Sequence, residues 1–186
     1  MVYGYFPCHA EGEDLVVLDP AHRREELVRI RFPRQQEERF LCLADFFRSE
    51  PGSDVVAFQV VTVGDQAGKI AEAMQERGDY SGSLYLHGLS VETAEALAEY
   101  WHRQVRRELG IPEAQGKRYS PGYPSWPELS DQRKVWKLLD PDRNIGVSLT
   151  SADQMVPEAS TSAVVLHHAD AVYYVVRGPA RAAAAG

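Results

Sequence analysis

The chain has 186 residues, of which 44% are hydrophobic and 25% are charged, a length and composition that suit a globular protein with a packed core. Its formal net charge of −7 argues against general nucleic-acid binding, which requires clustered Lys and Arg to neutralise phosphates. No apolar run approaches the roughly 20 residues of a membrane helix, and the N-terminus lacks the features of a signal peptide, so we expect a cytoplasmic protein that binds no membrane.

Alternation of apolar and polar residues, together with turn residues, predicts the secondary structure in chain order. Strands are expected first, at Asp14–Leu18, Leu27–Phe32 and Val55–Val63. Helices are expected next, at Gln66–Gln75, Ser90–Leu109 and Asp131–Leu139. Three more strands are expected at Val147–Thr150, Ala163–His167 and Val172–Val176. Strands, helices and strands in separate blocks predict a single α+β domain with a largely antiparallel sheet, followed by a disordered tail at 179–186.

The second predicted helix is long and has clear end signals. Ser90 is a candidate N-cap, and Gly110 followed by Pro112 should end the helix. Helical spacing predicts a core-facing apolar stripe made of Leu89, Leu97, Trp101 and Val105. An adjoining face carries polar residues three and four positions apart, namely Glu95, Glu99, His102 and Arg106.

The stretch from His102 to Arg118 is rich in Arg within an acidic chain. Cations at the end of a helix complement the negative end of its dipole, so one interpretation is a solvated helix end. The other interpretation is a docking surface for an acidic partner.

Metal ligands and nucleotide loops are poorly represented. Cys8 and Cys42 are the only cysteines, too few for a disulfide framework or a Cys-rich zinc site. The sequence GDQAGK at 64–69 lacks the spacing and the Ser or Thr of a phosphate loop. His167 and His168 are adjacent on a predicted strand, so their side chains should point to opposite faces. We expect no metal site and no catalytic triad.

The sequence RYSPGYPSWP at 118–127 combines prolines with aromatic residues. The prolines restrict the chain to extended conformations, and Gly122 lets the backbone bend or approach a ligand. Arg118 offers a fork for a carboxylate, and flat faces come from Tyr119, Tyr123 and Trp126. This pattern favours either a site for a small zwitterion that carries a ring and a positive centre, or a structured connector that crosses the sheet. Glu95, flanked by alanines, is a further candidate for a ligand contact.

Several motifs together resemble the C-terminal activation domain of cobalamin-dependent methionine synthase. They are RYSPGYPSWPELSDQRKVWKLLD, IGVSLTSADQMVPEASTSAVVLHHADAVYYVV and, further upstream, GEDLVV, RFPRQQ, CLADF and TAEALAEYWHRQVR. These motifs are co-linear with the family pattern over nearly the whole chain. The resemblance implies one α+β activation domain over 1–178, with a twisted, largely antiparallel β-sheet and flanking helices.

The resemblance also implies a ligand, S-adenosylmethionine (AdoMet), and a role for each site residue. Arg118 would hold the methionine carboxylate, and Glu95 would bond another polar group of the ligand. Ser120 would offer backbone hydrogen bonds to the adenine, beside the turn at Gly122. Tyr173 and Tyr174 would line the site from the last strand. Tyr123 would face the corrin of cobalamin, which a partner domain carries.

The function implied by the resemblance is reductive methylation of inactive cob(II)alamin to methylcobalamin, in support of methionine biosynthesis. The expected partners are the cobalamin-binding domain of methionine synthase and a flavodoxin-type electron donor. The sequence has neither the D-x-H-x-x-G motif of a cobalamin domain nor zinc-binding cysteines, so it should not make methionine alone. Family segments expected before the first residue and after the paired tyrosines are missing, which indicates a partial domain. The alternative is a non-catalytic module that senses AdoMet or docks a corrinoid protein.

Overall fold

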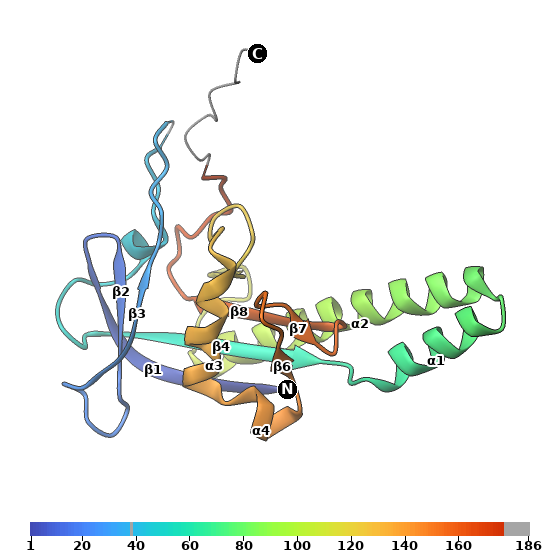
Figure 1. The fold of residues 1–186 in the computed structure, drawn as a ribbon. Helices are drawn as coiled ribbons and strands as arrows, with labels where there is room; N and C mark the ends of the chain where they lie inside the picture. Colours follow the sequence, from blue (N-terminus) through green and yellow to red (C-terminus); the bar gives the residue numbers. More distant parts are fainter. Residues whose placement is uncertain (38, 177–186) are drawn as a thin grey trace, which may run out of the picture.

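The computed structural model describes residues 1–37 and 39–176, so the predicted tail at 179–186 lies outside the described residues. Its main feature is a six-stranded sheet with the order β3-β2-β1-β4-β8-β5, in which all neighbouring strands are antiparallel. These strands are β1 (Val2–Glu11), β2 (Asp14–Leu18), β3 (Glu26–Arg31), β4 (Asp54–Thr62), β5 (Lys117–Tyr119) and β8 (Ser160–Leu166). Figure 1 shows β2 and β3 turned steeply relative to β4 and β8, so the sheet is twisted as expected.

Helices pack on both faces of this sheet. The C-terminal half of α2 (Tyr80–Glu108) packs on β4 and β8, whereas α3 (Gln132–Leu139) packs against β1, β3 and β4. Figure 1 shows α1 (Gln66–Glu76) and the first half of α2 projecting together beyond the sheet. The smaller elements are η1 (Leu43–Phe46), η2 (Leu129–Asp131), α4 (Pro141–Ile145) and a two-stranded sheet of β6 (Ser148–Leu149) and β7 (Met155–Val156).

The alternation of side chains along the strands separates two apolar clusters. Phe58 of β4 and Val164 of β8 belong to the large core on one face. Ala57 and Val165 belong to a small cluster on the other face, where they pack with Val105 of α2. Because successive residues of a strand point to opposite faces, the register of β5 against β8 decides which of its side chains reach α2.

The long helix begins earlier than the sequence predicted. Asp79 caps α2, since its side chain accepts a hydrogen bond from the Gly82 N–H at 2.9 Å. Ser90, the predicted cap, lies inside the helix and donates its hydroxyl to the carbonyl of Leu86. The helix continues through Ser90 because its hydroxyl bonds back to the preceding turn and leaves the backbone helical.

The predicted apolar stripe of this helix is also partly wrong. Val105 is fully buried, but Leu89, in the first half of α2, is 64% exposed. The helix meets the sheet mainly through the small side chains of Ala94 and Ala98. Of the alanines around Glu95, Ala94 and Ala98 are therefore part of the packing of helix on sheet, whereas Ala96 is exposed.

Several strand predictions need correction, and the short strands β5 and β7 were not predicted. β1 was missed because Gly4 and Pro7 interrupt its apolar pattern. Pro7 lies in the part of β1 that pairs only with β4, since β2 pairs only with Cys8–Glu11, and a single paired edge suits proline. The strand predicted at Val147–Thr150 is reduced to β6. The segment Val172–Val176 is not a strand, because polar side chains rather than a neighbouring ladder take up its backbone carbonyls.

Candidate functional site: a pocket between α2, β5 and the segment after β8

A pocket of about 400 Å³ opens where α2, β5 and the segment at 173–175 meet. This volume falls within the range of about 300–1,000 Å³ that is typical of small-molecule sites. Six of the seven predicted site residues line it, namely Glu95, Arg118, Ser120, Tyr123, Tyr173 and Tyr174. Tyr119 and Trp126, two of the aromatic residues named in the sequence analysis, also line it, and the residues that the sequence analysis did not name complete the lining: Pro124, Ser125 and Val175. The structure thus brings together residues from three separate parts of the chain, namely Glu95, 118–126 and 173–175.

Arg118 reaches this pocket because of its register in the sheet. It pairs with Val165 of β8, whose side chain packs with Val105 of α2, and so Arg118 points to the face that α2 covers. Tyr119 pairs with Val164 and points into the large core on the other face. The Tyr119 hydroxyl donates to the carbonyl of Val172 at 2.7 Å. One strand of three residues therefore supplies both a cation that lines the pocket and an anchor for the opposite wall.

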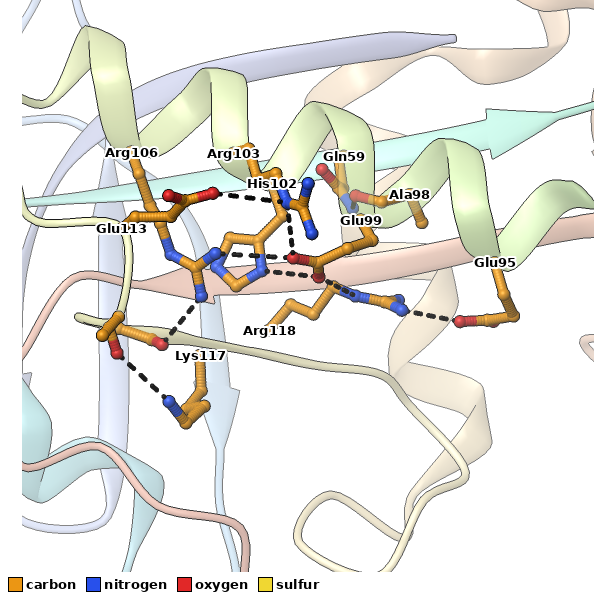
Figure 2. A network of polar contacts seen from close by, with 12 residues as sticks. Gln59, Glu95, Ala98, Glu99, His102, Arg103, Arg106, Glu113, Lys117 and Arg118 are labelled. Atoms are coloured by element: carbon orange, nitrogen blue, oxygen red, sulfur yellow. Dashed lines mark hydrogen bonds and ion pairs between the residues drawn. The ribbon is translucent and has the colours of Figure 1, made fainter.

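The central polar contact is an ion pair between β5 and α2. Nη2 of Arg118 donates to Oε2 of Glu95 at 2.6 Å, and the Arg118 side chain is only 17% exposed (Figure 2). Nε of Arg118 lies 4.0 Å from Oε2 of Glu99, one turn further along α2. A guanidinium has five N–H donors, so these contacts leave other donors for a ligand carboxylate.

Glu99 lies within a wider network of cations, also drawn in Figure 2. Its Oε1 lies 3.4 Å from Nε of Arg103 and 3.6 Å from Nη1 of Arg106. Its Oε2 lies 3.6 Å from Nδ1 of His102. Burial, reinforced by the positive charge of Arg106, lowers the pKa of His102 to about 4, so this imidazole is neutral near pH 7. Of the polar row predicted on the helix, Glu95 and Glu99 thus contact Arg118, whereas His102 and Arg106 contact Glu99.

The basic stretch contains a buried cation rather than only a solvated helix end. Nε of Arg106 donates to the carbonyl of Gln115 at 2.8 Å, and Nη2 donates to the carbonyl of Gly116 at 3.3 Å. Gly116 immediately precedes β5, so Arg106 connects α2 to the base of the strand that carries Arg118. The interpretation as a solvated end holds for Arg107, which is exposed, but not for Arg106. Docking of an acidic partner on this stretch stays a prediction.

The proline-rich segment folds into consecutive turns rather than an extended run. The N–H of Trp126 donates to the Tyr123 carbonyl, and the N–H of Gly122 donates to the Trp126 carbonyl, each at 2.8 Å. Gly122 has a φ of +86°, a conformation that glycine adopts without strain. It does not itself line the pocket, so its predicted contact with a ligand has no counterpart in the lining residues. The extended prediction failed because Gly122 and the prolines at 121 and 124 also suit tight turns.

The aromatic residues of the site divide into buried and exposed groups. Trp126 is fully buried, and its indole N–H donates to Asp131, so it supports the pocket from the core instead of offering a face to a ligand. Tyr123 and Tyr173 are 60% and 64% exposed. Tyr173 packs edge-to-face on Tyr119, with ring centroids 5.4 Å apart. The two exposed rings are the faces available to a ligand or a partner.

The segment after β8 is held by hydrogen bonds from two other parts of the chain, Gln35 and the turn at Pro124 and Ser125. The hydroxyl of Ser125 donates to the carbonyl of Tyr174, and the N–H of Val176 donates to the backbone carbonyl of Pro124. The side-chain amide of Gln35 donates to the carbonyl of Val175 at 3.0 Å. Tyr173 and Tyr174 thus line the pocket from an irregular segment, not from the predicted last strand. Tyr174 belongs to the large core, where burial raises the pKa of its hydroxyl.

Two other places among the described residues were considered as sites, a second hollow and a cluster of possible metal ligands. A wider hollow of about 1,380 Å³ shares Tyr173–Val175 with the pocket, but charges of both signs line it, including Arg31, Glu37 and Lys134. Asp19, His22 and Glu25 lie close enough together to hold an ion. Asp19 already accepts hydrogen bonds from the N–H groups of Ala21 and His22, which accounts for this geometry as a turn. In residues 1–37 and 39–176, no helix is long and apolar enough to cross a membrane.

A family model and two relatives match nearly the whole chain. The family model described as "Vitamin B12 dependent methionine synthase, activation domain" matches residues 1–181. Methionine synthase of Mycobacterium tuberculosis is 43% identical and that of Mycobacterium leprae 41% identical, each over 95% of this chain. The chain spans only 17% of the length of either relative.

A solved structure shares the fold. It is described as the MetH reactivation domain bound to AdoHcy (S-adenosylhomocysteine), and it superposes with a TM-score of 0.85 at 30% sequence identity. The match covers 94% of this chain and 60% of that one. Matching sequence over nearly the whole chain and a shared fold lead to one conclusion: this chain belongs to the activation-domain family of vitamin B12 dependent methionine synthases.

Proposed function

We propose that the chain binds AdoMet in the pocket between α2, β5 and 173–175, with the methionine carboxylate on Arg118. The observation that carries the proposal is the pairing of Arg118 with Glu95 at the wall of a pocket of about 400 Å³. A cation and an anion from neighbouring elements suit a ligand that has a carboxylate and an ammonium group on one carbon. The solved relative, which is bound to AdoHcy, supports the same class of ligand.

The individual groups fit the parts of such a ligand. The remaining N–H donors of Arg118 can hold a carboxylate with two parallel hydrogen bonds. The contact with Arg118 engages Oε2 of Glu95, so Oε1 can accept a hydrogen bond from the ammonium group. Ser120 lines the pocket, and its carbonyl already accepts the N–H of Tyr123 at 3.3 Å, which fixes its backbone beside the ligand. The exposed ring of Tyr173 offers a face for the adenine or the sulfonium.

We further propose that this domain supports reductive methylation of cob(II)alamin when a cobalamin-binding domain docks over the pocket. In that reaction the sulfonium supplies an activated methyl group, one electron comes from a flavodoxin-type donor, and methylcobalamin and AdoHcy are formed. The residues of this chain bind and orient the methyl donor, and no acid–base group is required of them. The exposed Tyr123 ring at the pocket would face the flat corrin.

Transfer of a labelled methyl group tests this proposal. The chain is mixed with a reduced corrinoid protein, a one-electron donor and AdoMet labelled in the methyl group, and methylcobalamin is quantified. We expect label on the corrinoid protein only when this chain is present, and we expect added AdoHcy to suppress it. Binding of AdoMet without any transfer would instead favour a sensor or docking module. No binding at millimolar AdoMet would contradict the proposal as a whole.

A further inference from the structure

The two carboxylates that flank Arg118 have different surroundings, although both lie on α2 and both side chains are 41% exposed. Glu95 lines the pocket and contacts only Arg118 among the ion pairs of the described residues. Glu99 does not line the pocket, and it lies within 4.0 Å of four different side chains. A carboxylate with this many basic neighbours behind a binding site is suited to holding another side chain in place.

Each carboxylate oxygen of Glu99 faces two basic side chains, and only Oε2 faces a residue of β5. Oε1 faces Arg103 and Arg106, whereas Oε2 faces His102 and Arg118 (Figure 2). Arg106 cannot move freely, because it is buried and donates to the carbonyls of Gln115 and Gly116. A fixed cation on one side of Glu99 therefore limits where its other oxygen can lie, beside the Nε edge of Arg118.

His102 also favours one position of the Glu99 carboxylate. Its side chain is 2% exposed, and within the described part of the chain neither ring nitrogen has a hydrogen-bond partner. Nδ1 is 3.6 Å from Oε2 of Glu99, so a small shift of that carboxylate would complete a hydrogen bond. An unpaired buried nitrogen costs free energy, which favours keeping the Glu99 carboxylate close to His102.

We infer that Glu99 is a positioning residue for the AdoMet carboxylate: it holds the Nε edge of Arg118, so that the remaining donors of the guanidinium point into the pocket. The inference rests on the proposed function and adds to it a residue that does not touch the ligand. In this inference Arg106 keeps Glu99 in position through their ion pair. Glu95, in contrast, contacts the ligand directly. Without Glu99, Arg118 keeps its charge but loses one of the two carboxylates that orient it.

Two ligands separate positioning from general stability. Decarboxylated AdoMet retains the adenosine, the sulfonium and the amino group but lacks the group that Arg118 holds. The ratio of its Kd to the Kd of AdoMet therefore reports the contribution of the carboxylate alone. We expect the natural sequence to give a large ratio and Arg118→Ala to give a ratio near one, because that variant has no fork.

The decisive variant is Glu99→Gln, measured by calorimetry with both ligands. We expect the ratio to fall by about tenfold, since a misplaced guanidinium loses a charge-assisted hydrogen bond. Glu92→Gln, an exposed position on the same helix, is the matched control and should leave the ratio unchanged. Glu99→Asp should restore part of the ratio.

The outcomes distinguish the inference from the proposed function. If Glu99→Gln weakens both ligands equally, or weakens neither, the inference about Glu99 is wrong while AdoMet binding stands. If the natural sequence itself gives a ratio near one, or binds no AdoMet, the proposed function fails first. Thermal unfolding of each variant shows whether parallel losses arise from a destabilised fold.

Discussion

Arg118 on an edge strand and Glu95 on the longest helix are joined by a hydrogen bond of 2.6 Å, although 23 residues separate them in sequence. This pair forms where the α2 face of the sheet ends and the pocket begins. It is only partly exposed, so water screens it less than it screens a surface ion pair. The pair combines the two charges that a zwitterionic ligand requires, and the following predictions examine its surroundings.

Replacement of Arg118 by Lys should weaken AdoMet binding by about 1–3 kcal/mol, because a point charge replaces a planar fork. Isothermal titration calorimetry with AdoMet measures the change. Arg107→Lys, at an exposed position on α2, is the control for an Arg-to-Lys change away from the pocket and should bind as the natural sequence does. Equal affinity of Arg118→Lys and the natural sequence would remove Arg118 from the site.

Tyr123→Ala should leave AdoMet affinity within about 0.5 kcal/mol, as is usual for a surface substitution, while slowing methyl transfer to a corrinoid protein. The reason is that the Tyr123 ring is 60% exposed at the pocket, where a docked corrin would meet it. Tyr85→Ala, an exposed tyrosine on the projecting part of α2, should change neither quantity. Loss of AdoMet binding with normal transfer at saturation would show that Tyr123 serves the ligand instead.

Gly122→Ala should destabilise the fold by about 1–2 kcal/mol, because alanine is strained at positive φ. The added Cβ would also lie 3.1 Å from Cδ1 of Leu129. Gly88→Ala is the opposite case, since Gly88 lies within α2 and its Cβ would meet nothing within 4 Å. That variant should be more stable by about 0.5–1 kcal/mol. Urea unfolding of both variants checks the contrast, and a neutral Gly122→Ala would contradict it.

His102 should make the fold sensitive to mild acid. Its pKa is about 4 in the folded protein, lowered mainly by burial, against an ordinary value of 6.5. Between these values the unfolded chain binds a proton that the folded chain does not, so the free energy of unfolding decreases as the pH falls through this window. The loss should be about 1–3 kcal/mol.

The test compares His102→Gln with the natural sequence by urea unfolding at several values between pH 4.5 and pH 7.5. The variant should show a flatter pH dependence, because glutamine does not titrate. His87→Gln, at an exposed position on α2, should retain the slope of the natural sequence. Identical slopes for His102→Gln and the natural sequence would show that His102 is not protonated differently on unfolding.

The sequence predicted most of the fold wherever an element's pattern matched its packing. The strands β2, β3 and β4 have strong apolar patterns on buried surfaces, and each was placed within one or two residues. β1 was missed because Gly4 and Pro7, which are unfavourable in strands, interrupt its apolar pattern. The start of α2 was missed because its first half projects beyond the sheet beside α1, where no continuous apolar stripe is needed.

The candidate site was predicted in its residues but not in its geometry. Arg118 and Glu95 were both named, yet the hydrogen bond between them depends on the register of β5 against β8, which sequence spacing does not reveal. Trp126 appeared suited to a ligand because aromatic type alone cannot distinguish a core ring from an exposed one. Glu99 and Arg106 were seen only as a polar row, since their role depends on a strand that follows them in the chain.

A crystal structure of this chain with S-adenosylhomocysteine tests the central claim most directly, because that product cannot donate a methyl group and therefore persists. We predict electron density for the ligand in the pocket lined by Glu95 and Tyr173, with its carboxylate bonded to the guanidinium of Arg118. Ligand density elsewhere on the molecule, or an empty pocket at saturating ligand with Arg118 bonded only to Glu95, would contradict the account.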